Sequence, residues 1–267
     1  MKAKAYAKLN LFLNVKGKRE DGYHDLEMVN ITVGLADELE FTLTDGEIVC
    51  ETSDKNLNGK NNLAYKAAVF MQKIFKVKSG VKIFVEKNIP VGGGLGGGSA
   101  DAAATIETLN KIWNLNLTFD QMFEIAKNFG SDTPYCLYKG PAIVKGIGFD
   151  ITPINLDISN YEISLFTPNV AIATGNVFSN LKNNNKYSLD LAIKYLTSGN
   201  YEDFIKGLKN DLQDTAFELY PEVREKYEFL KKTYGEEGLF MTGSGSTIVK
   251  ISKPKKQKCL EKTQLSF

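Results

Sequence analysis

The chain has 267 residues, 43% of them hydrophobic, which is enough for the core of one large or two modest domains. Its 33 Lys and Arg residues nearly balance 32 Asp and Glu residues, and a net charge of +1 leaves no overall basic field to hold nucleic acid. Three widely separated cysteines (Cys50, Cys136 and Cys259) and one histidine exclude a disulfide scaffold and a Cys/His zinc site.

The first half of the chain is predicted to contain several strands and three helices. Residues 8–15 alternate polar and apolar side chains, which predicts a strand with Lys8 and Asn10 side by side. Further strands, which would make an antiparallel sheet, are predicted at 28–35, 38–43, 48–52 and 81–85. A turn is predicted between two of them at Asp45-Gly46. Helical periodicity predicts three helices, at 62–75, 100–113 and 119–129. The last of them begins with a capping box formed by Thr118 and Gln121.

The pattern begins again after about residue 150, so we expect a domain boundary near Pro153, with domains at 1–152 and 153–267. The second half is predicted to hold a strand, helical segments and a closing hairpin: 161–166, near Val177, 189–196, 221–232, and 238–241 with 247–251. Two α+β halves disfavour a doubly wound parallel sheet, so the predicted fold class is α+β. The lysine-rich residues 253–262 are interpreted as a solvated end.

Nothing in the sequence indicates a membrane protein or a secreted one. Polar residues interrupt every apolar stretch among the first fifteen residues, so no signal peptide is expected. No later run approaches the length of about 18 apolar residues that a spanning helix needs. We therefore expect a cytoplasmic protein.

Residues 90–99, P-V-G-G-G-L-G-G-G-S, follow a predicted strand and lead into an Ala-rich helix. Six glycines in seven positions permit positive φ, so successive N–H groups can converge on an anion at the positive end of the helix. The loop is not a Walker A motif, because Gly98 stands where a lysine is required before Ser99. It also lacks the β-α-β context of a dinucleotide fingerprint. The sequence predicts a phosphate-binding loop, with a flexible linker as the alternative.

Three further segments carry candidate chemistry. Asp132 has a carboxylate that, together with Lys8 and the glycine loop, would supply the groups needed for phosphoryl transfer to an alcohol. Considered by itself, Asp132 is more simply interpreted as a turn residue without a catalytic role. Tyr23 and His24 combine a π-face with an imidazole and suit a nucleobase, or form a surface turn. Residues 242–246, T-G-S-G-S, form a second small-residue loop or a hairpin turn.

Together these segments resemble the GHMP kinases, small-molecule kinases named for galactokinase, homoserine, mevalonate and phosphomevalonate kinases. The resemblance covers nearly the whole chain, and its three motifs match residues 7–11, 90–104 and 241–246. The D-G-Y-H run of residues 21–24 and the G-S-D-T-P-Y run of residues 130–135 are similar to one branch of the family, which acts on a cytidine diphosphate-linked methylerythritol. The resemblance implies an N-terminal ATP-binding domain of the ribosomal-protein-S5-like type and a C-terminal ferredoxin-like α+β domain.

The resemblance also implies a reaction and a set of roles. The γ-phosphoryl group of ATP would pass, with Mg²⁺, to the 2-hydroxyl of that substrate in non-mevalonate isoprenoid synthesis. Asp132 would take the hydroxyl proton, and Lys8 would be its electrostatic partner. The implied substrate-binding residues are Asn10, Tyr23, His24, Thr174 and Phe178. The implied ATP-binding residues are Asn61, Asn62, Lys87, Pro90, Gly92, Gly93, Gly94, Leu95, Gly96, Gly97, Gly98 and Ser99, and no protein metal cage is expected. Residues 210–212, N-D-L, match a family segment that we interpret as structural.

Other interpretations stay open at this stage. A GHMP kinase acting on another alcohol, such as homoserine or a mevalonate derivative, would leave Tyr23 and His24 unexplained. A catalytically silent nucleotide-binding module would not need Asp132 and Lys8. A nucleic-acid-binding protein is disfavoured by the net charge of +1 and by the lack of a stripe of aromatic and basic residues. We expect small-molecule partners only, no membrane partner, and a monomer or weak homodimer.

Overall fold

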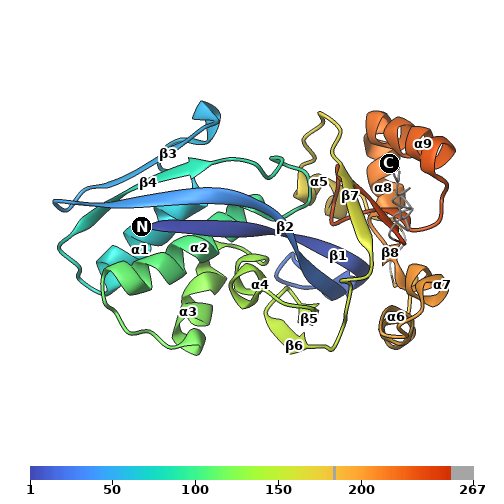
Figure 1. Cartoon of the computed structure of the whole chain (residues 1–267), viewed down its shortest axis with the longest axis horizontal. Coiled ribbons are helices and arrows are strands. Elements are labelled where there is room, and N and C mark those ends of the chain that lie inside the picture. The colour runs from blue at the N-terminus through green and yellow to red at the C-terminus, as the bar shows by residue number, and fades with distance from the viewer. Residues whose placement is uncertain (183–184, 254–267) are drawn as a thin grey trace, which may run out of the picture.

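The computed structural model describes residues 1–182 and 185–253. Within them the strands are β1 Lys2–Lys18, β2 His24–Thr44, β3 Ile48–Thr52, β4 Gly80–Glu86, β5 Ala142–Gly146, β6 Asp150–Pro153, β7 Glu162–Phe166, β8 Lys209–Asn210, β9 Leu239–Met241 and β10 Ile248–Ser252. The larger sheet has the order β3-β4-β2-β1-β8 and is extended by β5, which pairs with β2, and by β6, which pairs with β5 (Figure 1). A second sheet has the order β7-β10-β9. Cys259 and the predicted lysine-rich end after Lys253 lie outside the described residues.

The helices are α1 Leu63–Ile74, α2 Gly97–Ile112, α3 Phe119–Ala126, α4 Thr133–Tyr138, α5 Thr174–Ser179, α6 Leu189–Leu196, α7 Tyr201–Phe204, α8 Gln213–Leu219 and α9 Pro221–Tyr234. Short 3-10 helices are η1 Lys55–Leu57, η2 Lys127–Phe129 and η3 Ile205–Gly207. Helices and strands in both halves confirm the α+β prediction, and the capping box of α3 is present as predicted. Helices α1, α2 and α3 pack on one face of the larger sheet (Figure 1).

Alanine side chains bring helices α1 and α2 close together. The buried residues of α1 include Ala64, Ala67 and Ala68, and α2 buries Ala100 and residues 102–104. Small side chains let two helix backbones approach and bury their common face against β4 and the adjoining part of β2. Helix α2 begins at Gly97, earlier than the predicted residue 100, because the last glycines of the loop already have helical conformation. The N-terminus of α2 therefore lies within the glycine loop.

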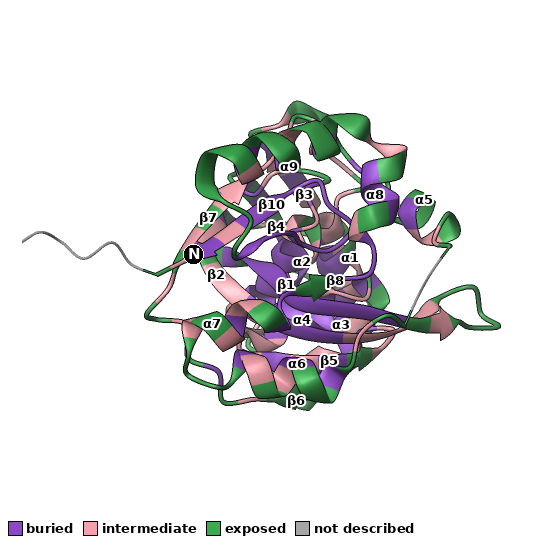
Figure 2. Ribbon diagram, turned by 90° about the vertical axis from the view of Figure 1, so that its right-hand side faces the viewer, coloured by how far each residue is buried: buried purple, intermediate pink, exposed green. Residues whose placement is uncertain are grey.

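Strand β1 runs through the middle of the molecule and confirms the predicted alternation. It pairs antiparallel with β2 along most of its length, and Lys8 and Asn10 project from the same face. Residues 7–15 are buried on both faces, so the polar face of the strand is covered by protein instead of facing water (Figure 2). A buried polar face must be satisfied by specific partners, and those partners form the site described below.

Two predictions about the sheet need correction. Residues 28–35 and 38–43 belong to the single strand β2, not to two strands. Strand β3 does not return along β2 in a hairpin, although Gly46 has the φ of +86° expected for a turn. It pairs parallel with β4 instead. The segment between β3 and β4 contains α1, and a crossover through a helix places its two strands parallel.

The part of the chain after Pro153 completes the larger sheet as well as building its own. Strand β8 pairs parallel with β1 at Phe12 and Leu13. Leu9 and Leu11 of β1 also share a buried cluster with Leu196 and Phe204. The division into domains at residues 152 and 153 stays a prediction, because residues on both sides of it contribute to one core. Across the described ranges, no helix combines the length and apolar content that crossing a bilayer requires.

Candidate active site

The glycine loop crosses directly over strand β1 at Lys8. The Lys8 backbone N–H donates to the Leu95 carbonyl oxygen at 3.0 Å. Gly96 has a φ of +71°, and a Cβ atom there would lie 3.0 Å from Cγ of Lys8. Only glycine meets both conditions without strain, so this residue type is what allows the lysine side chain to pass under the loop.

The same loop contacts residues 242–246, which connect β9 and β10. A Cβ at Gly94 would lie 2.7 Å from the Thr242 carbonyl oxygen, and one at Gly243 would lie 2.9 Å from the Gly94 carbonyl oxygen. The Thr247 N–H donates to the Gly93 carbonyl oxygen at 3.2 Å. The segment is therefore more than a hairpin turn, because it supports the glycine loop backbone against backbone.

Lys8 and Asp132 form an ion pair where β1 meets the end of the glycine loop. Lys8 Nζ lies 3.4 Å from Asp132 Oδ2 and donates to Asn10 Oδ1 at 2.8 Å. Asn10 Nδ2 in turn donates to Asn30 Oδ1 at 2.7 Å. The Lys8 side chain is 7% exposed, whereas that of Asp132 is 35% exposed. The ammonium group is thus fixed in place and the carboxylate remains accessible to a ligand.

Both polar groups of the Asn10 amide are used within the protein. The oxygen accepts from Lys8, and the nitrogen donates to Asn30, with the Met28 sulfur 3.3 Å away. Asn10 lines the cavity beside Lys8 but is only 1% exposed. This arrangement suits a residue that positions the lysine. The contact with Asn30 was not predicted from the sequence.

Asp132 is held by a short helix that the sequence analysis missed. The predicted helix through 129 is present as α3 followed by η2, and Asp132 stands at the N-cap position of α4. Thr133 Oγ1 donates to the Phe129 carbonyl oxygen at 2.9 Å, which ties the two helices together. Helix α4 has six residues, too few for periodicity to be visible in the sequence.

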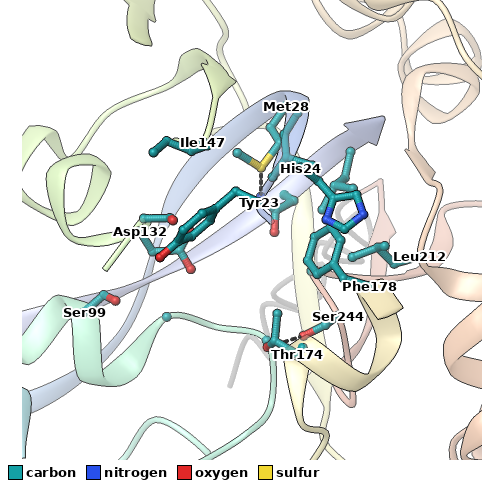
Figure 3. A pocket seen from close by; sticks show the side chains of 18 of the residues that line it. Tyr23, His24, Met28, Ser99, Asp132, Ile147, Thr174, Phe178, Leu212 and Ser244 are labelled. Atoms are coloured by element: carbon teal, nitrogen blue, oxygen red, sulfur yellow. Dashed lines mark hydrogen bonds between the residues drawn. The ribbon is translucent and has the colours of Figure 1, made fainter. Parts of the chain in front are cut away.

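A cavity of about 580 Å³ opens beside this ion pair. Every residue that the resemblance assigned to catalysis or to the substrate lines it: Lys8, Asn10, Tyr23, His24, Asp132, Thr174 and Phe178. Figure 3 shows Asp132 on one side of the cavity and the His24 and Phe178 rings on the other. The structure therefore brings these residues together around one cavity, although they come from four separate parts of the chain.

The His24 and Phe178 rings form the end of the cavity away from Asp132, and Tyr23 also lines the cavity. The His24 and Phe178 rings lie 4.9 Å apart between centroids at 30°, so Phe178 covers the imidazole. Tyr23 is 56% exposed and leaves its ring free to meet a ligand. Burial, with the positive charge of Lys18, lowers the pKa of His24 below its usual 6.5. The imidazole is therefore neutral near pH 7, with one donor and one acceptor nitrogen.

Thr174 opens helix α5 at the side of the same cavity. Its Oγ1 is 2.9 Å from Oγ of Ser244, a buried residue of the 242–246 loop. The hydroxyl pair joins α5 to that loop and keeps both beside the glycine loop. Ser244 lines the cavity and was not named from the sequence.

A second cavity, of about 450 Å³, lies on the other side of the glycine loop. It is lined by every residue that the resemblance assigned to ATP: Asn61, Asn62, Lys87, Pro90, Gly92, Gly93, Gly94, Leu95, Gly96, Gly97, Gly98 and Ser99. Gly94, Gly96 and Ser99 line both cavities. The two cavities therefore meet at the glycine loop and at Ser99.

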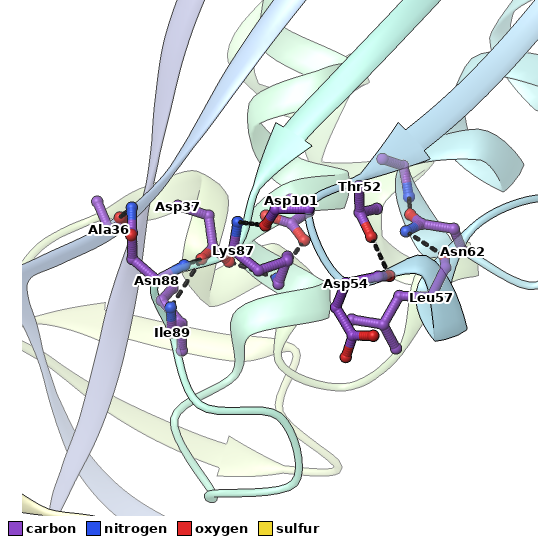
Figure 4. A network of polar contacts seen from close by, with 12 residues as sticks. Ala36, Asp37, Thr52, Asp54, Leu57, Asn62, Lys87, Asn88, Ile89 and Asp101 are labelled. Atoms are coloured by element: carbon purple, nitrogen blue, oxygen red, sulfur yellow. Dashed lines mark hydrogen bonds and ion pairs between the residues drawn. The ribbon is translucent and has the colours of Figure 1, made fainter.

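Lys87 is committed to two buried carboxylates instead of pointing freely into the second cavity. Its Nζ pairs with Asp37 and lies 2.7 Å from Asp101 Oδ2, and its side chain is 8% exposed (Figure 4). The other oxygen of Asp37 accepts from the N–H groups of Asn88 and Ile89 at 2.6 and 2.7 Å. This network, which we call the Lys87 clamp, ties both ends of the glycine loop to β2.

The clamp holds two carboxylates and one ammonium group away from water. Burial raises the pKa of Asp101 to about 7, with Lys87 opposing the shift and Asp37 adding to it. Asp101 Oδ1 has no hydrogen-bond partner within the described residues. Asp37 was not recognised from the sequence, although a charged residue inside an apolar strand is a signal of a buried pair.

The two asparagines assigned to the adenine side differ in their surroundings. Asn62 caps helix α1, where its Oδ1 accepts from the Ala64 N–H at 2.8 Å, and its Nδ2 donates to the Leu57 carbonyl oxygen at 3.0 Å. Asn61 is exposed at the rim of the second cavity. The Asn62 amide therefore already has hydrogen-bond partners within the protein, whereas the Asn61 side chain is exposed and available to a ligand.

Comparison with known proteins identifies the class. The model of the GHMP kinases N terminal domain matches residues 62–140, and that of the GHMP kinases C terminal domain matches residues 192–261. The chain belongs to the GHMP kinase family. A Bacillus cytotoxicus protein named 4-diphosphocytidyl-2-C-methyl-D-erythritol kinase is 41% identical over 249 residues, covering 92% of this chain and 86% of the relative. A Bacillus cereus protein of the same name has the same identity and coverage.

Solved structures agree on the fold. A crystal structure of 4-(cytidine 5'-diphospho)-2C-methyl-D-erythritol kinase has a TM-score of 0.79 at 30% identity, covering 93% of this chain and 89% of that one. A homoserine kinase from Cytophaga hutchinsonii has a TM-score of 0.71 at 17% identity, covering 96% of this chain and 85% of that one. The second likeness concerns the fold alone, and the matches to an N-terminal and a C-terminal family model confirm the two-domain architecture expected from the resemblance.

Proposed function

We propose that the chain is a kinase that transfers the γ-phosphoryl group of ATP to the 2-hydroxyl of 4-diphosphocytidyl-2-C-methyl-D-erythritol, giving the 2-phosphate and ADP. The observation that carries the proposal is the make-up of the first cavity. One space joins the Lys8–Asp132 ion pair to the His24 and Phe178 rings, and Tyr23 lines the same space. A substrate with an alcohol at one end and a cytosine at the other fits such a cavity.

The second cavity suits the nucleotide. Its floor is the glycine loop, whose N–H groups precede the N-terminus of α2, and both features attract a triphosphate. Because the two cavities share Gly94, Gly96 and Ser99, a γ-phosphate held by the loop would face the first cavity. The reacting alcohol and the phosphoryl group would then meet beside Asp132.

Asp132 would accept the proton of the 2-hydroxyl as its oxygen attacks the γ-phosphorus. Lys8, fixed by Asn10 at 2.8 Å, would stabilise the negative charge of that oxygen and of the transferred group. The bond from the γ-phosphorus to the bridging oxygen breaks, and ADP leaves with its electron pair. A largely dissociative transition state asks more of positioning than of proton removal, so the fixed geometry of Lys8 carries much of the catalysis.

Tyr23 would stack on the cytosine, and neutral His24 would hydrogen-bond its edge. Because Phe178 covers His24, its contribution is to hold the imidazole in place beside the base. Thr174, at the N-terminal end of α5, would complete the polar side of the cavity. Asn10 acts in this scheme by positioning Lys8.

Oxygen atoms suitable for Mg²⁺ are present where the two cavities meet. Mg²⁺ keeps several waters and usually takes one or two protein ligands in addition to substrate phosphates. Ser99, which carries a hydroxyl, lines both cavities and Asp132 is 35% exposed, so these residues fit such a site. The described part of the chain has no cluster of three or more His, Cys, Asp or Glu side chains. The ion would supply charge neutralisation on the phosphates.

The direct test is ADP release by the purified protein with Mg-ATP and different acceptors. We expect release with 4-diphosphocytidyl-2-C-methyl-D-erythritol and none above background with homoserine, mevalonate or no acceptor. Release of ADP with another alcohol would be consistent with a GHMP kinase but would contradict the assignment of Tyr23 and His24 to a cytosine. No release with any acceptor, despite measurable ATP binding, would favour a silent nucleotide-binding module.

A further inference from the structure

Two apolar side chains line the reacting end of the first cavity and have no part in the proposed mechanism. Met28 is 4% exposed, and its sulfur lies 3.3 Å from Nδ2 of Asn10. Asn10 is the residue that holds the Lys8 ammonium group. Met28 therefore lies one side chain away from the Lys8–Asp132 ion pair.

Ile147 approaches the same end from the turn between β5 and β6. Its neighbour Gly148 packs so closely that a Cβ there would lie 2.5 Å from the Ser131 carbonyl oxygen. This contact fixes the turn against the residue that precedes Asp132. Figure 3 shows Ile147 on the Asp132 side of the cavity, with His24 and Phe178 on the other side.

Strand β2 relates the two ends of the cavity to each other. His24, Leu26 and Met28 are spaced by two residues, share one face of the strand, and all line the cavity. At a rise of about 3.4 Å per residue, His24 and Met28 lie about 14 Å apart along the strand. An extended chain of ribose, diphosphate and a four-carbon alcohol spans such a distance, so a base at His24 places the alcohol carbons beside Met28.

We propose that Met28 and Ile147 form an apolar subsite for the methyl group on the carbon that bears the reacting hydroxyl. The inference rests on the proposed function. In a 2-C-methyl-erythritol, carbon 2 carries both the hydroxyl and the methyl group. Once the hydroxyl lies between Asp132 and Lys8, the methyl group must face the neighbouring wall, where these two side chains exclude water. The subsite selects a tertiary alcohol over the secondary alcohol of unbranched erythritol.

The test compares kcat/KM for 4-diphosphocytidyl-2-C-methyl-D-erythritol and for the analogue that lacks the methyl group. A hydrophobic pocket discriminates against a missing methyl by roughly ten-fold or more, so we expect that preference in the unaltered protein. Ile147→Ala should reduce it to about three-fold or less, because the methyl then gains little contact. Ile147→Phe should fill the subsite and reverse the preference.

Leu26→Ala is the matched control, since Leu26 lies on the same face of β2 but nearer His24. It should change kcat/KM for both acceptors by the same factor. Ile147 lies half-buried at a turn, and thermal unfolding of each variant checks that the fold is kept. An unchanged preference in both Ile147 variants would overturn the subsite and leave the proposed function standing. Absence of phosphorylation of either acceptor by the unaltered protein would overturn both.

Discussion

The Lys8 ammonium group lies 3.4 Å from the Asp132 carboxylate, although the two residues come from the first strand and from a short helix late in the first half of the chain. Lys8 is buried and fixed by Asn10, whereas Asp132 is partly open to the cavity. A buried cation beside an accessible carboxylate is an arrangement that stabilises an attacking oxygen as it loses its proton. The predictions below follow from this pair and its surroundings.

Asp132→Asn should lower kcat by about 10²- to 10⁴-fold, the range that general-base catalysis contributes. The side chain keeps its size and the nucleotide cavity is untouched, so the Kd for ATP should stay within a few-fold. Steady-state kinetics and calorimetric ATP binding measure the two quantities. A variant that retains most of its kcat would remove Asp132 from the mechanism.

Gly96→Ala should lower both kcat and stability. The substitution places a Cβ 3.0 Å from Lys8 Cγ at a residue with φ of +71°. Left-handed backbone costs a non-glycine residue about 1–2 kcal/mol, and displacement of Lys8 should lower kcat by about ten-fold or more. Gly34→Ala is the control, because nothing lies within 4 Å of a Cβ there. Equal behaviour of the two variants in kinetics and thermal unfolding would contradict the argument.

Tyr23→Ala should raise the KM for the cytidyl substrate by about 5- to 150-fold, which is the loss expected when one base loses an aromatic stacking partner. The KM for ATP should change little, because Tyr23 lines only the first cavity. Tyr23→Phe keeps the ring and should restore most of the affinity. An unaltered KM in the alanine variant would move the cytosine site elsewhere.

Acidification should weaken binding of the cytidyl substrate by protonating His24. Burial and the Lys18 charge lower the pKa of His24 from 6.5, so the neutral form persists below that pH. The KM should therefore be flat near pH 7 and rise only well into the acid range. Lys18→Gln removes the repelling charge and should shift the onset of this rise to higher pH. Coincident pH profiles for the two proteins would contradict the assignment.

Asp101→Asn should change how stability depends on pH. A carboxyl whose pKa is raised to about 7 in the folded state binds a proton that the unfolded chain has released above pH about 4. Stability from this group is therefore greatest below pH about 4 and is lost as pH rises towards 7. Thermal unfolding between pH 5 and 8 should show the wild type losing Tm relative to the variant. Parallel curves would mean that Asp101 is ionised throughout.

The sequence by itself determined most of the local structure and indicated the chemistry proposed for the site. Periodicity located strand β1 and helices α1, α3 and α9. The glycine loop, the D-G-Y-H run and the resemblance to the GHMP kinases indicated the residues that line the two adjoining cavities. These signals are local. The hydrophobic periodicity of a strand or helix is found in consecutive residues, and a phosphate-binding loop needs glycines close together in the sequence.

Only the tertiary structure decided which distant residues meet. Strand β3 pairs with β4 and not with β2, Lys87 is held by Asp37 and Asp101, and Asn10 is occupied by Lys8 and Asn30. Such pairings are set by how sheets, helices and loops pack, and a buried polar side chain takes the partner that packing brings to it. For that reason the residue types of this site can be predicted from the sequence. Which of those residues are free to contact a ligand, and which hold a neighbouring side chain in place, cannot.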